Sequence, residues 1–251
     1  MSGHSKWSTI KHKKGAADAK RGKLFSKLSR AIMVAAKEGG GDPATNLALQ
    51  NAIEKARSYS MPKDNIERAV AKGSGEGADG ASFEVVVYEG YGPDGVAVIV
   101  EALTDNRNRT AADVRHLFAK HGGNLGATGA VAWQFERRGV LLVVAEGVDE
   151  DHLVLVAAEA GADDVERDGS SFLVSTAPEQ LAAVREGLET GGFELESAEL
   201  AMVPKTTVEI ADEGVAKQVV RLVDGLEEND DVQDVYANFD IPEAMLEAVA
   251  S

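Results

Sequence analysis

The apolar positions of the first 73 residues recur with the period of an α-helix and predict three helices in succession. Five apolar residues share one side of the first helix: Leu24, Phe25, Leu28, Ile32 and Ala35. For the second helix, Asp42 is a suitable N-cap and Pro43 a suitable first residue. The predicted helices span residues 16–37, 43–58 and 62–73. We therefore expect a small helical bundle at the amino end.

After residue 80 the period changes to that of β-strands alternating with helices. The glycine-rich stretch 73–80 between the two patterns is typical of a flexible linker. Strands are expected at 83–89, 96–103 and 131–136, and a helix at 110–121. From residue 140 the order of elements is β-α-β-β-α-β, the ferredoxin-like arrangement, over 140–145, 149–160, 164–167, 171–176, 178–190 and 194–203. A strand, a helix and a strand follow at 207–210, 213–227 and 232–238.

These elements predict an α+β multidomain protein, with an N-terminal three-helix domain followed by two α/β domains of ferredoxin-like element order. The last strand, helix and strand complete the earlier set at 81–136 better than they stand alone. We therefore expect the third domain to be inserted in the second. The predicted domains are 1–80, basic and helical with a linker, then 81–136 plus 204–251, and 137–203 as the ferredoxin-like insertion.

Positive charge is concentrated at the amino end. Residues 1–30 contain nine lysines and arginines against one acid, Asp18, which gives this segment a net charge of +8. The whole chain of 251 residues carries −16, so the remaining 221 residues carry −24. A protein that gathers its cations in this way usually presents them to a polyanion, and nucleic acid is the first candidate. The acidic remainder should be repelled by that polyanion, so that the basic end docks first.

Composition narrows the class of protein further. A hydrophobic content of 44% with 27% charged residues is ordinary for a globular domain. The chain has no cysteine, which excludes disulfides, thiolate metal sites and cysteine nucleophiles. No apolar run approaches the roughly 18 residues that span a bilayer, and the first residues lack the apolar core of a secretory signal. We expect a cytoplasmic protein with no membrane partner.

The first helix has two faces. Four cations, Lys20, Lys23, Lys27 and Arg30, project within about 80° of one another, opposite the apolar side. A stripe of this kind is often only a solvated face. Here a second basic cluster without nearby acids precedes it, and two of its rings suit stacking on bases. The predicted nucleic-acid-binding residues are Lys6, Trp7, Lys11, His12, Lys13, Lys14, Lys20, Arg21, Lys23, Lys27 and Arg30.

A second candidate is the polar segment 104–110, between a strand and a helix. It offers Asp105, Asn106, Arg107, Asn108 and Arg109, with Arg115 nearby. One interpretation is structural: Asp105 or Thr110 caps the helix, the asparagines shape the turn, and the arginines pair with nearby acids. The other is a loop that grips phosphate or a ribosomal surface. Spacing does not separate the two, and residues 122–129 form a further loop that we place beside this one.

Motifs for catalysis or cofactors are weak. The Gly75–Gly80 segment fits G-x-G-x-x-G, but it follows a helix, and its two acids would repel a pyrophosphate. His116 and His121 are five positions apart on one helix and do not share a face, so they are poor partners for one metal ion. We expect no enzyme activity, no metal, no cofactor and no small-molecule substrate.

Several longer motifs resemble the YebC/PmpR family, and the resemblance covers essentially the whole chain. They are Gly3-His4-Ser5-Lys6-Trp7, Ile10-Lys11-His12-Lys13-Lys14, Lys20-Arg21-Gly22-Lys23, Met61-Pro62-Lys63-Asp64-Asn65-Ile66-Glu67-Arg68-Ala69, Tyr88-Glu89-Gly90-Tyr91-Gly92-Pro93, Thr104-Asp105-Asn106-Arg107-Asn108-Arg109-Thr110 and Gly122-Gly123-Asn124-Leu125-Gly126. The resemblance implies an N-terminal helical domain with two α/β domains, and no enzyme activity or cofactor. It implies a DNA-binding regulator of transcription.

The resemblance also carries an alternative function. Relatives include a mitochondrial activator of cytochrome oxidase subunit one synthesis and bacterial factors that relieve ribosome stalling at proline runs. The expected partner is therefore nucleic acid, either DNA or ribosomal RNA and tRNA, with the ribosome among the candidates. Lysines position phosphates without reading bases, and no strong helix-turn-helix with base-reading side chains is visible in the sequence. That absence favours structured RNA slightly.

Overall fold

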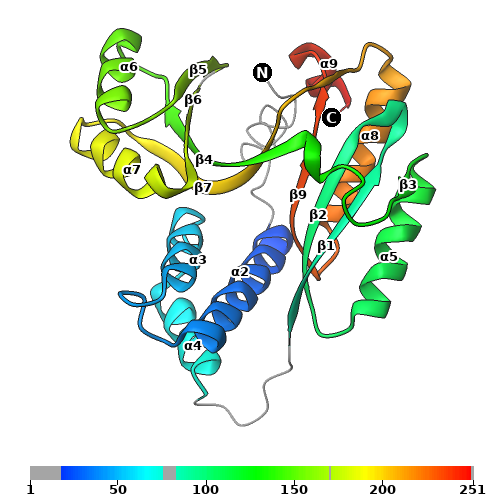
Figure 1. The fold of residues 1–251 in the computed structure, drawn as a ribbon, viewed down its shortest axis with the longest axis horizontal. Helices are drawn as coiled ribbons and strands as arrows, with labels where there is room; N and C mark the ends of the chain where they lie inside the picture. The colour runs from blue at the N-terminus through cyan, green and yellow to red at the C-terminus, as the bar shows by residue number, and fades with distance from the viewer. Residues whose placement is uncertain (1–17, 76–82, 170, 250–251) are drawn as a thin grey trace. The chain divides into compact units, whose positions relative to one another are not determined.

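The computed structural model describes residues 18–75, 83–169 and 171–249. They form two compact units, one over Glu136–Val203 and the other from the segments on both sides of it, up to Phe135 and from Pro204. The chain is α+β, with helices first and two sheet-bearing α/β parts after them (Figure 1). In the described ranges, no helix combines the length and apolarity needed to cross a bilayer.

The helices of the amino end pack around one small apolar core. They are α2 (Asp18–Gly39), α3 (Leu47–Ser58) and α4 (Lys63–Gly73). Leu28 and Ile32 of α2 meet Leu49 of α3 and Ile66 of α4 in that core. The predicted helical period is therefore confirmed for all three.

The predicted start of the second helix is wrong. Asn46 caps α3 by accepting a hydrogen bond from the N–H of Leu49, and its amide donates to the carbonyl oxygens of Ala35 (2.7 Å) and Gly40 (2.8 Å). Asp42 instead closes a separate turn by accepting from the N–H of Ala44. One buried amide that satisfies three backbone groups outweighs the local Asp-Pro signal.

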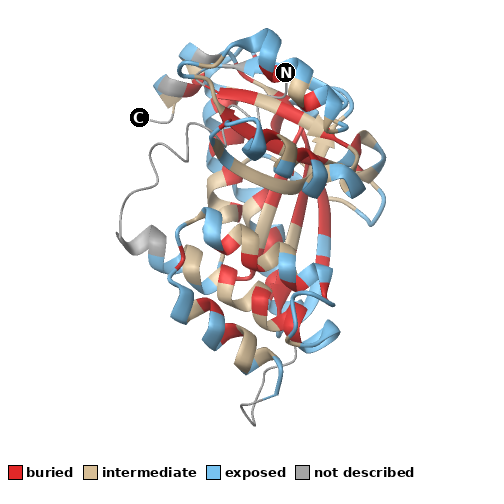
Figure 2. Cartoon of the chain, turned by 90° about the vertical axis from the view of Figure 1, so that its left-hand side faces the viewer, coloured by how far each residue is buried: buried red, intermediate tan, exposed pale blue. Residues whose placement is uncertain are grey.

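The larger unit also contains an antiparallel sheet in the order β3-β1-β2-β9. Its strands are β1 (Glu84–Tyr91), β2 (Ala97–Thr104), β3 (Asn124–Leu125) and β9 (Val232–Ala237). Helices α5 (Arg107–Lys120) and α8 (Glu213–Glu227) bury one face of it, where Phe118 and Leu222 are fully buried. Figure 2 shows buried residues running along the strands and on the inner sides of the helices.

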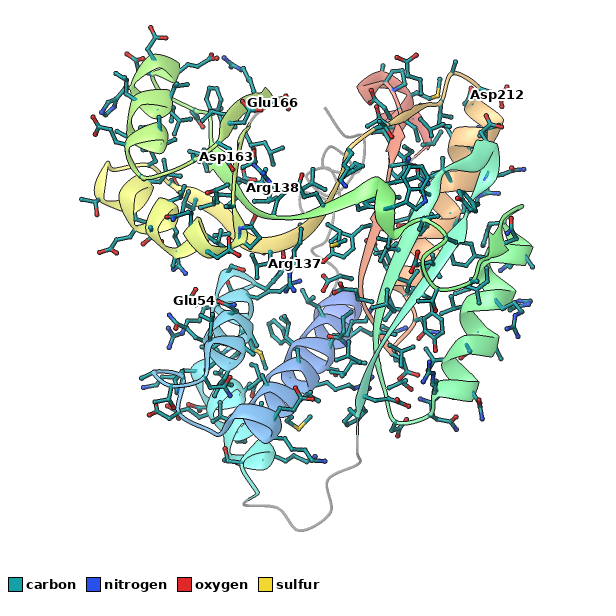
Figure 3. All side chains as sticks on the ribbon, in the orientation of Figure 1. Glu54, Arg137, Arg138, Asp163, Glu166 and Asp212 are labelled. Atoms are coloured by element: carbon teal, nitrogen blue, oxygen red, sulfur yellow. The ribbon has the colours of Figure 1, made fainter. Side chains whose placement is uncertain are left out.

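The inserted unit has the ferredoxin-like order. Its elements are β4 (Phe135–Val144), α6 (Glu150–Glu159), β5 (Asp164–Asp168), β6 (Ser171–Thr176), α7 (Leu181–Thr190) and β7 (Leu195–Pro204). The strands lie side by side as β5-β6-β4-β7, with β6 antiparallel to both β4 and β5. Both helices pack on this sheet, and Arg138 of β4 forms an ion pair of 2.6 Å with Asp163 (Figure 3).

Two further predictions differ from the structure, and two elements at the chain end were not predicted. The separate strand expected at 131–136 is wrong, because Ala132–Gln134 is a single 3₁₀ turn and β4 runs unbroken from Phe135. The helix expected from residue 110 begins at Arg107. The chain end holds β10 (Phe239–Asp240), which pairs in parallel with the short β8 (Val208–Glu209), and then α9 (Glu243–Val249). Two other 3₁₀ turns occur at Pro93–Gly95 and Pro178–Gln180.

Candidate nucleic-acid interface

Part of the predicted basic surface lies outside the described residues. This part comprises Lys6, Trp7, Lys11, His12, Lys13 and Lys14. Lys20 and Arg21 belong to α2, and the three remaining cations follow them on the same helix.

Those three cations contact the last residue of α8 and the turn that follows it. Lys27 donates through Nζ to the carbonyl oxygen of Glu227, and Arg30 donates through Nη1 to the carbonyl oxygen of Asp230 at 2.9 Å. Lys23 lies 3.8 Å from the Asp230 carboxylate, and both side chains are mostly exposed. One side of the basic helix thus faces an acidic turn of the same chain.

Asp231 is the centre of this contact. Its Oδ1 accepts a hydrogen bond from Arg30 at 3.1 Å. Its Oδ2 accepts from Arg109 at 2.7 Å and from the hydroxyl of Thr110 at 2.8 Å, with the hydroxyl of Thr104 at 3.3 Å. The Asp231 side chain is only 8% exposed, so this carboxylate joins α2, the end of β2 and the first turn of α5 inside the protein.

The surroundings of Asp231 keep it ionised. Burial by itself raises the pKa of this carboxyl group, but the hydrogen bonds from Arg109 and Thr110 and the charges of Arg109 and Arg30 lower it by more. The pKa of Asp231 therefore lies below its ordinary value. A buried carboxylate of this kind is stable only while its partners are in place.

The segment 104–110 begins a helix and is not a loop. Asn106 caps α5 by accepting from the N–H of Arg109 at 3.1 Å, and Asp105 forms an ion pair of 2.9 Å with the Arg109 side chain. The structural interpretation holds for Arg109, although the cap is Asn106 and not Asp105 or Thr110. The same helix start leaves a different set of side chains at the surface.

Besides Arg109, whose side chain is 48% exposed, three predicted residues of α5 lie at the surface. They are Arg107, Asn108 and Arg115. Their side chains form no hydrogen bond or ion pair with the described part of the chain. These two arginines, unlike Arg109, are available to an external anion.

A hollow lies where Arg30 and Arg109 both approach Asp231, but the net charge of its lining does not suit a phosphate group. Its lining comprises Arg30, Phe83, Asp105, Arg109, Asp113, Asn229, Asp230 and Asp231. Four carboxylates oppose two guanidinium groups there, and the Arg30 guanidinium lies 5.0 Å from the centre of the Phe83 ring. These two arginines fix the fold of the unit, since an anion entering the hollow would meet more negative than positive charge.

The loop expected at 122–129 continues to Ala132 and is held by Glu89, a role that the sequence did not indicate. The Glu89 carboxylate accepts from the backbone N–H groups of Gly129 (2.7 Å), Val131 (2.8 Å) and Ala132 (2.8 Å). Glu89 is 5% exposed, and its burial raises its pKa, yet the three N–H donors more than offset this and place the pKa below the ordinary value. The glycines of 122–129 were the only signal in the sequence.

Trp133, at the end of this loop, was also missed. It is 68% exposed, and it is the only aromatic side chain among the exposed large hydrophobic residues of the described ranges. The apolar pattern had assigned it to a strand, so its place in a 3₁₀ turn was not foreseen.

Comparison with known proteins matches nearly the whole chain. Residues 83–239 match the TACO1/YebC second and third domain, and residues 5–76 match the TACO1/YebC protein N-terminal domain. A relative named probable transcriptional regulatory protein, from Rubrobacter xylanophilus, is 59% identical over 250 residues, covering 100% of both chains. One of the same name from Persephonella marina is 54% identical over 251 residues, again covering 100% of both.

A solved structure is also similar to this chain in both sequence and fold. The crystal structure of a conserved hypothetical protein, Aq1575 from Aquifex aeolicus, is 52% identical to this chain, with a TM-score of 0.81. The match covers 90% of this chain and 92% of the other.

Proposed function

This chain belongs to the TACO1/YebC family, and from that premise we propose that it is a non-enzymatic, nucleic-acid-binding regulator of gene expression acting in the cytoplasm. Relatives that match it over their full length are named probable transcriptional regulatory proteins, which supports regulation as the role. DNA is the partner that this name favours.

The observation that carries the proposal is the charge of the amino end. Nine cations against one acid lie within 30 residues of a chain whose net charge is −16. Electrostatic contact with phosphates explains why these cations are gathered, and the acidic remainder turns the basic end toward the polyanion.

The described contacts indicate different roles for different cations of this surface. Lys27 is bound to the end of α8 and Arg30 to the turn after it, so these two side chains hold α2 in place. We assign phosphate contact to the lysines of residues 6–14, to the exposed Lys23 and, on α5, to Arg107 and Arg115.

Salt-dependent binding tests the proposal. Fluorescence anisotropy with a labelled duplex DNA, measured over a range of salt concentrations, gives both affinity and the number of phosphate contacts. Reversing three lysines (Lys11→Glu, Lys13→Glu and Lys14→Glu) should weaken binding and reduce the salt slope by about 2 to 3. The matched control reverses three exposed lysines elsewhere (Lys63→Glu, Lys120→Glu and Lys217→Glu). Equal losses in both triple variants would overturn the assignment.

A second candidate function is a ribosome-associated factor that contacts ribosomal RNA or tRNA. The exposed side of α4 weakens the case for a base-reading helix in a DNA groove, because Asp64 and Glu67 would repel the phosphates on either side of that groove. Lys63 is engaged by Glu67 at 3.5 Å, and Arg68 donates to the carbonyl oxygen of Asp64 at 3.1 Å. A helix with this surface is a poor reader of bases.

Parallel experiments separate the two functions. Sedimentation with ribosomes at moderate salt, lost in the Lys11/Lys13/Lys14 variant and kept in the control variant, would support the RNA function. Strong preference for one promoter duplex over a scrambled duplex would support the transcriptional function. Binding to neither would refute both.

A further inference from the structure

Trp133 is displayed at the surface by a loop that the protein has fixed in place. A large aromatic ring at 68% exposure loses most of the stabilisation that burial would give it. Solvent exposure of such a ring is ordinary on a mobile segment. Here the surrounding contacts are those of a rigid one.

Five hydrogen bonds hold the backbone that precedes the ring. Glu89 accounts for four: three backbone N–H groups donate to its buried carboxylate, and the N–H of Gly126 donates to its carbonyl oxygen at 2.7 Å. In the fifth, the hydroxyl of Tyr91 donates to the carbonyl oxygen of Ala130 at 2.9 Å. This loop is therefore anchored to β1 over its whole length.

The orientation of the ring is fixed as well. The indole Nε1–H of Trp133 donates to the same Ala130 carbonyl oxygen at 3.1 Å. The one polar group of the side chain is thus satisfied within the loop. What remains for a partner is the π face of the ring, which suits stacking.

A cation lies on the neighbouring segment. The N–H of Lys205 donates to the carbonyl oxygen of Gln134 at 2.8 Å, next to Trp133 in the chain. The Lys205 side chain is exposed and forms no ion pair with the described residues. The amide of Asn238 steadies this segment by donating to the Gln134 side chain (3.3 Å) and to the carbonyl oxygen of Thr206 (3.2 Å).

An exposed aromatic ring on one segment and an exposed cation on the segment bonded to it match the chemistry of an unpaired nucleotide. The base stacks on the ring, and the phosphate meets the ammonium group. Two exposed carboxylates, Glu136 and Glu209, and one exposed arginine, Arg137, flank these segments in the sequence, so the local charge attracts a duplex backbone only weakly. Stacking, which needs an unpaired base, then supplies most of the affinity at this place.

We propose that Trp133 is a stacking site for an unpaired base, with Lys205 on the adjacent phosphate. This inference rests on the proposed function, and it adds that the nucleic acid carries single-stranded or looped-out nucleotides. It places a second contact on the middle domain, separate from the basic amino end.

Tryptophan fluorescence tests the site directly, because the chain has only two tryptophans. In a Trp7→Phe variant, Trp133 is the sole emitter. Titration with an RNA hairpin that carries an unpaired loop should quench it to saturation, whereas a blunt RNA duplex of the same stem should not. Anisotropy of labelled RNA in the same samples reports binding independently of the quenching.

Substitution gives the second readout. Trp133→Ala should weaken hairpin binding about tenfold and leave the blunt duplex unchanged, while Trp133→Phe should restore most of the affinity, since a phenyl ring also stacks. Leu47→Ala is the matched control, because Leu47 is 69% exposed and apolar but lies on α3. It should change neither affinity.

The outcomes distinguish failure of this site from failure of the proposed function. Hairpin binding seen by anisotropy without quenching, or unchanged by Trp133→Ala, would overturn the stacking site and leave the ring to a protein partner. Absence of binding to any nucleic acid would refute the proposed function itself.

Discussion

The guanidinium group of Arg30 lies 3.1 Å from Oδ1 of Asp231, a residue 201 positions later in the chain. Through this pair the basic helix is attached to the turn after α8, and through the other oxygen of Asp231 that turn is attached to α5. One carboxylate therefore joins the helical part of the larger unit to its sheet. The positive charge of α2 has a structural use in addition to the one proposed for nucleic acid.

Replacing Asp231 should destabilise the protein. Asp231→Asn removes the charge that Arg30 and Arg109 share, and it leaves buried hydroxyl groups with a poorer acceptor, so we expect a loss of about 1 to 3 kcal/mol. Urea denaturation followed by circular dichroism measures it. The control is Asp230→Asn, where the side chain is 74% exposed and the change should stay within about 0.5 kcal/mol. Equal stability of the two variants would show that Asp231 does not stabilise the contact between α2, β2 and α5.

Removing the charge of Asp230 should strengthen nucleic-acid binding slightly. Lys23 lies 3.8 Å from this carboxylate, and both groups are well exposed, so the pair is weak and competes with a phosphate for the same cation. We expect Asp230→Asn to bind a labelled duplex about twofold to fivefold more tightly at low salt, with the difference disappearing at high salt. A difference that persists at high salt would point to a cause other than charge.

Acid should release the loop that carries Trp133. The folded-state pKa of Glu89 is lowered, so the stabilisation from its ionised form is complete above the ordinary value of 4.5 and is lost as the pH falls through the folded-state pKa. In the Trp7→Phe background, Trp133 emission should shift in that acid range before global unfolding. Glu89→Gln should be less stable at neutral pH, and its deficit should shrink as the pH falls. A deficit that does not vary with pH would exclude the carboxylate as its source.

The arginines of α5 should separate into two kinds. Arg109→Ala should lower the melting temperature, because it takes a partner from Asp231, and its effect on binding should follow its effect on folding. Arg107→Ala and Arg115→Ala should leave the melting temperature unchanged and weaken binding to nucleic acid, since both side chains are exposed and neither forms a hydrogen bond or ion pair with the described residues. Thermal melts beside anisotropy titrations measure both quantities. The reverse pattern would assign phosphate contact to Arg109.

The sequence predicted what depends on neighbours in the chain. The helical period of α2 and the β-α-β-β-α-β order of the inserted unit are local patterns, and the structure confirms them. The start of α3 was misplaced because Asn46 acts through carbonyl oxygens of another segment. The strand expected at 131–136 failed because a carboxylate about 40 residues earlier takes up the backbone N–H groups there.

The same distinction applies to the candidate site. Clusters of lysine and arginine are visible in the sequence as soon as charge is counted. The acid that engages Arg109 is 122 residues away, so no spacing rule separates this arginine from the exposed Arg107 and Arg115. Only the folded chain shows which cations are already neutralised.

A backbone hydrogen bond joins Gln134 and Lys205, which lie just before and just after the inserted unit Glu136–Val203. The residues on either side of the inserted unit are thus already neighbours, and the sheet β3-β1-β2-β9 contains no strand of that unit. If the inserted unit is removed and replaced by a few glycines, the remaining chain should fold by itself. Such a shortened protein would reveal what the inserted unit adds to a regulator whose proposed nucleic-acid contacts all lie outside that unit.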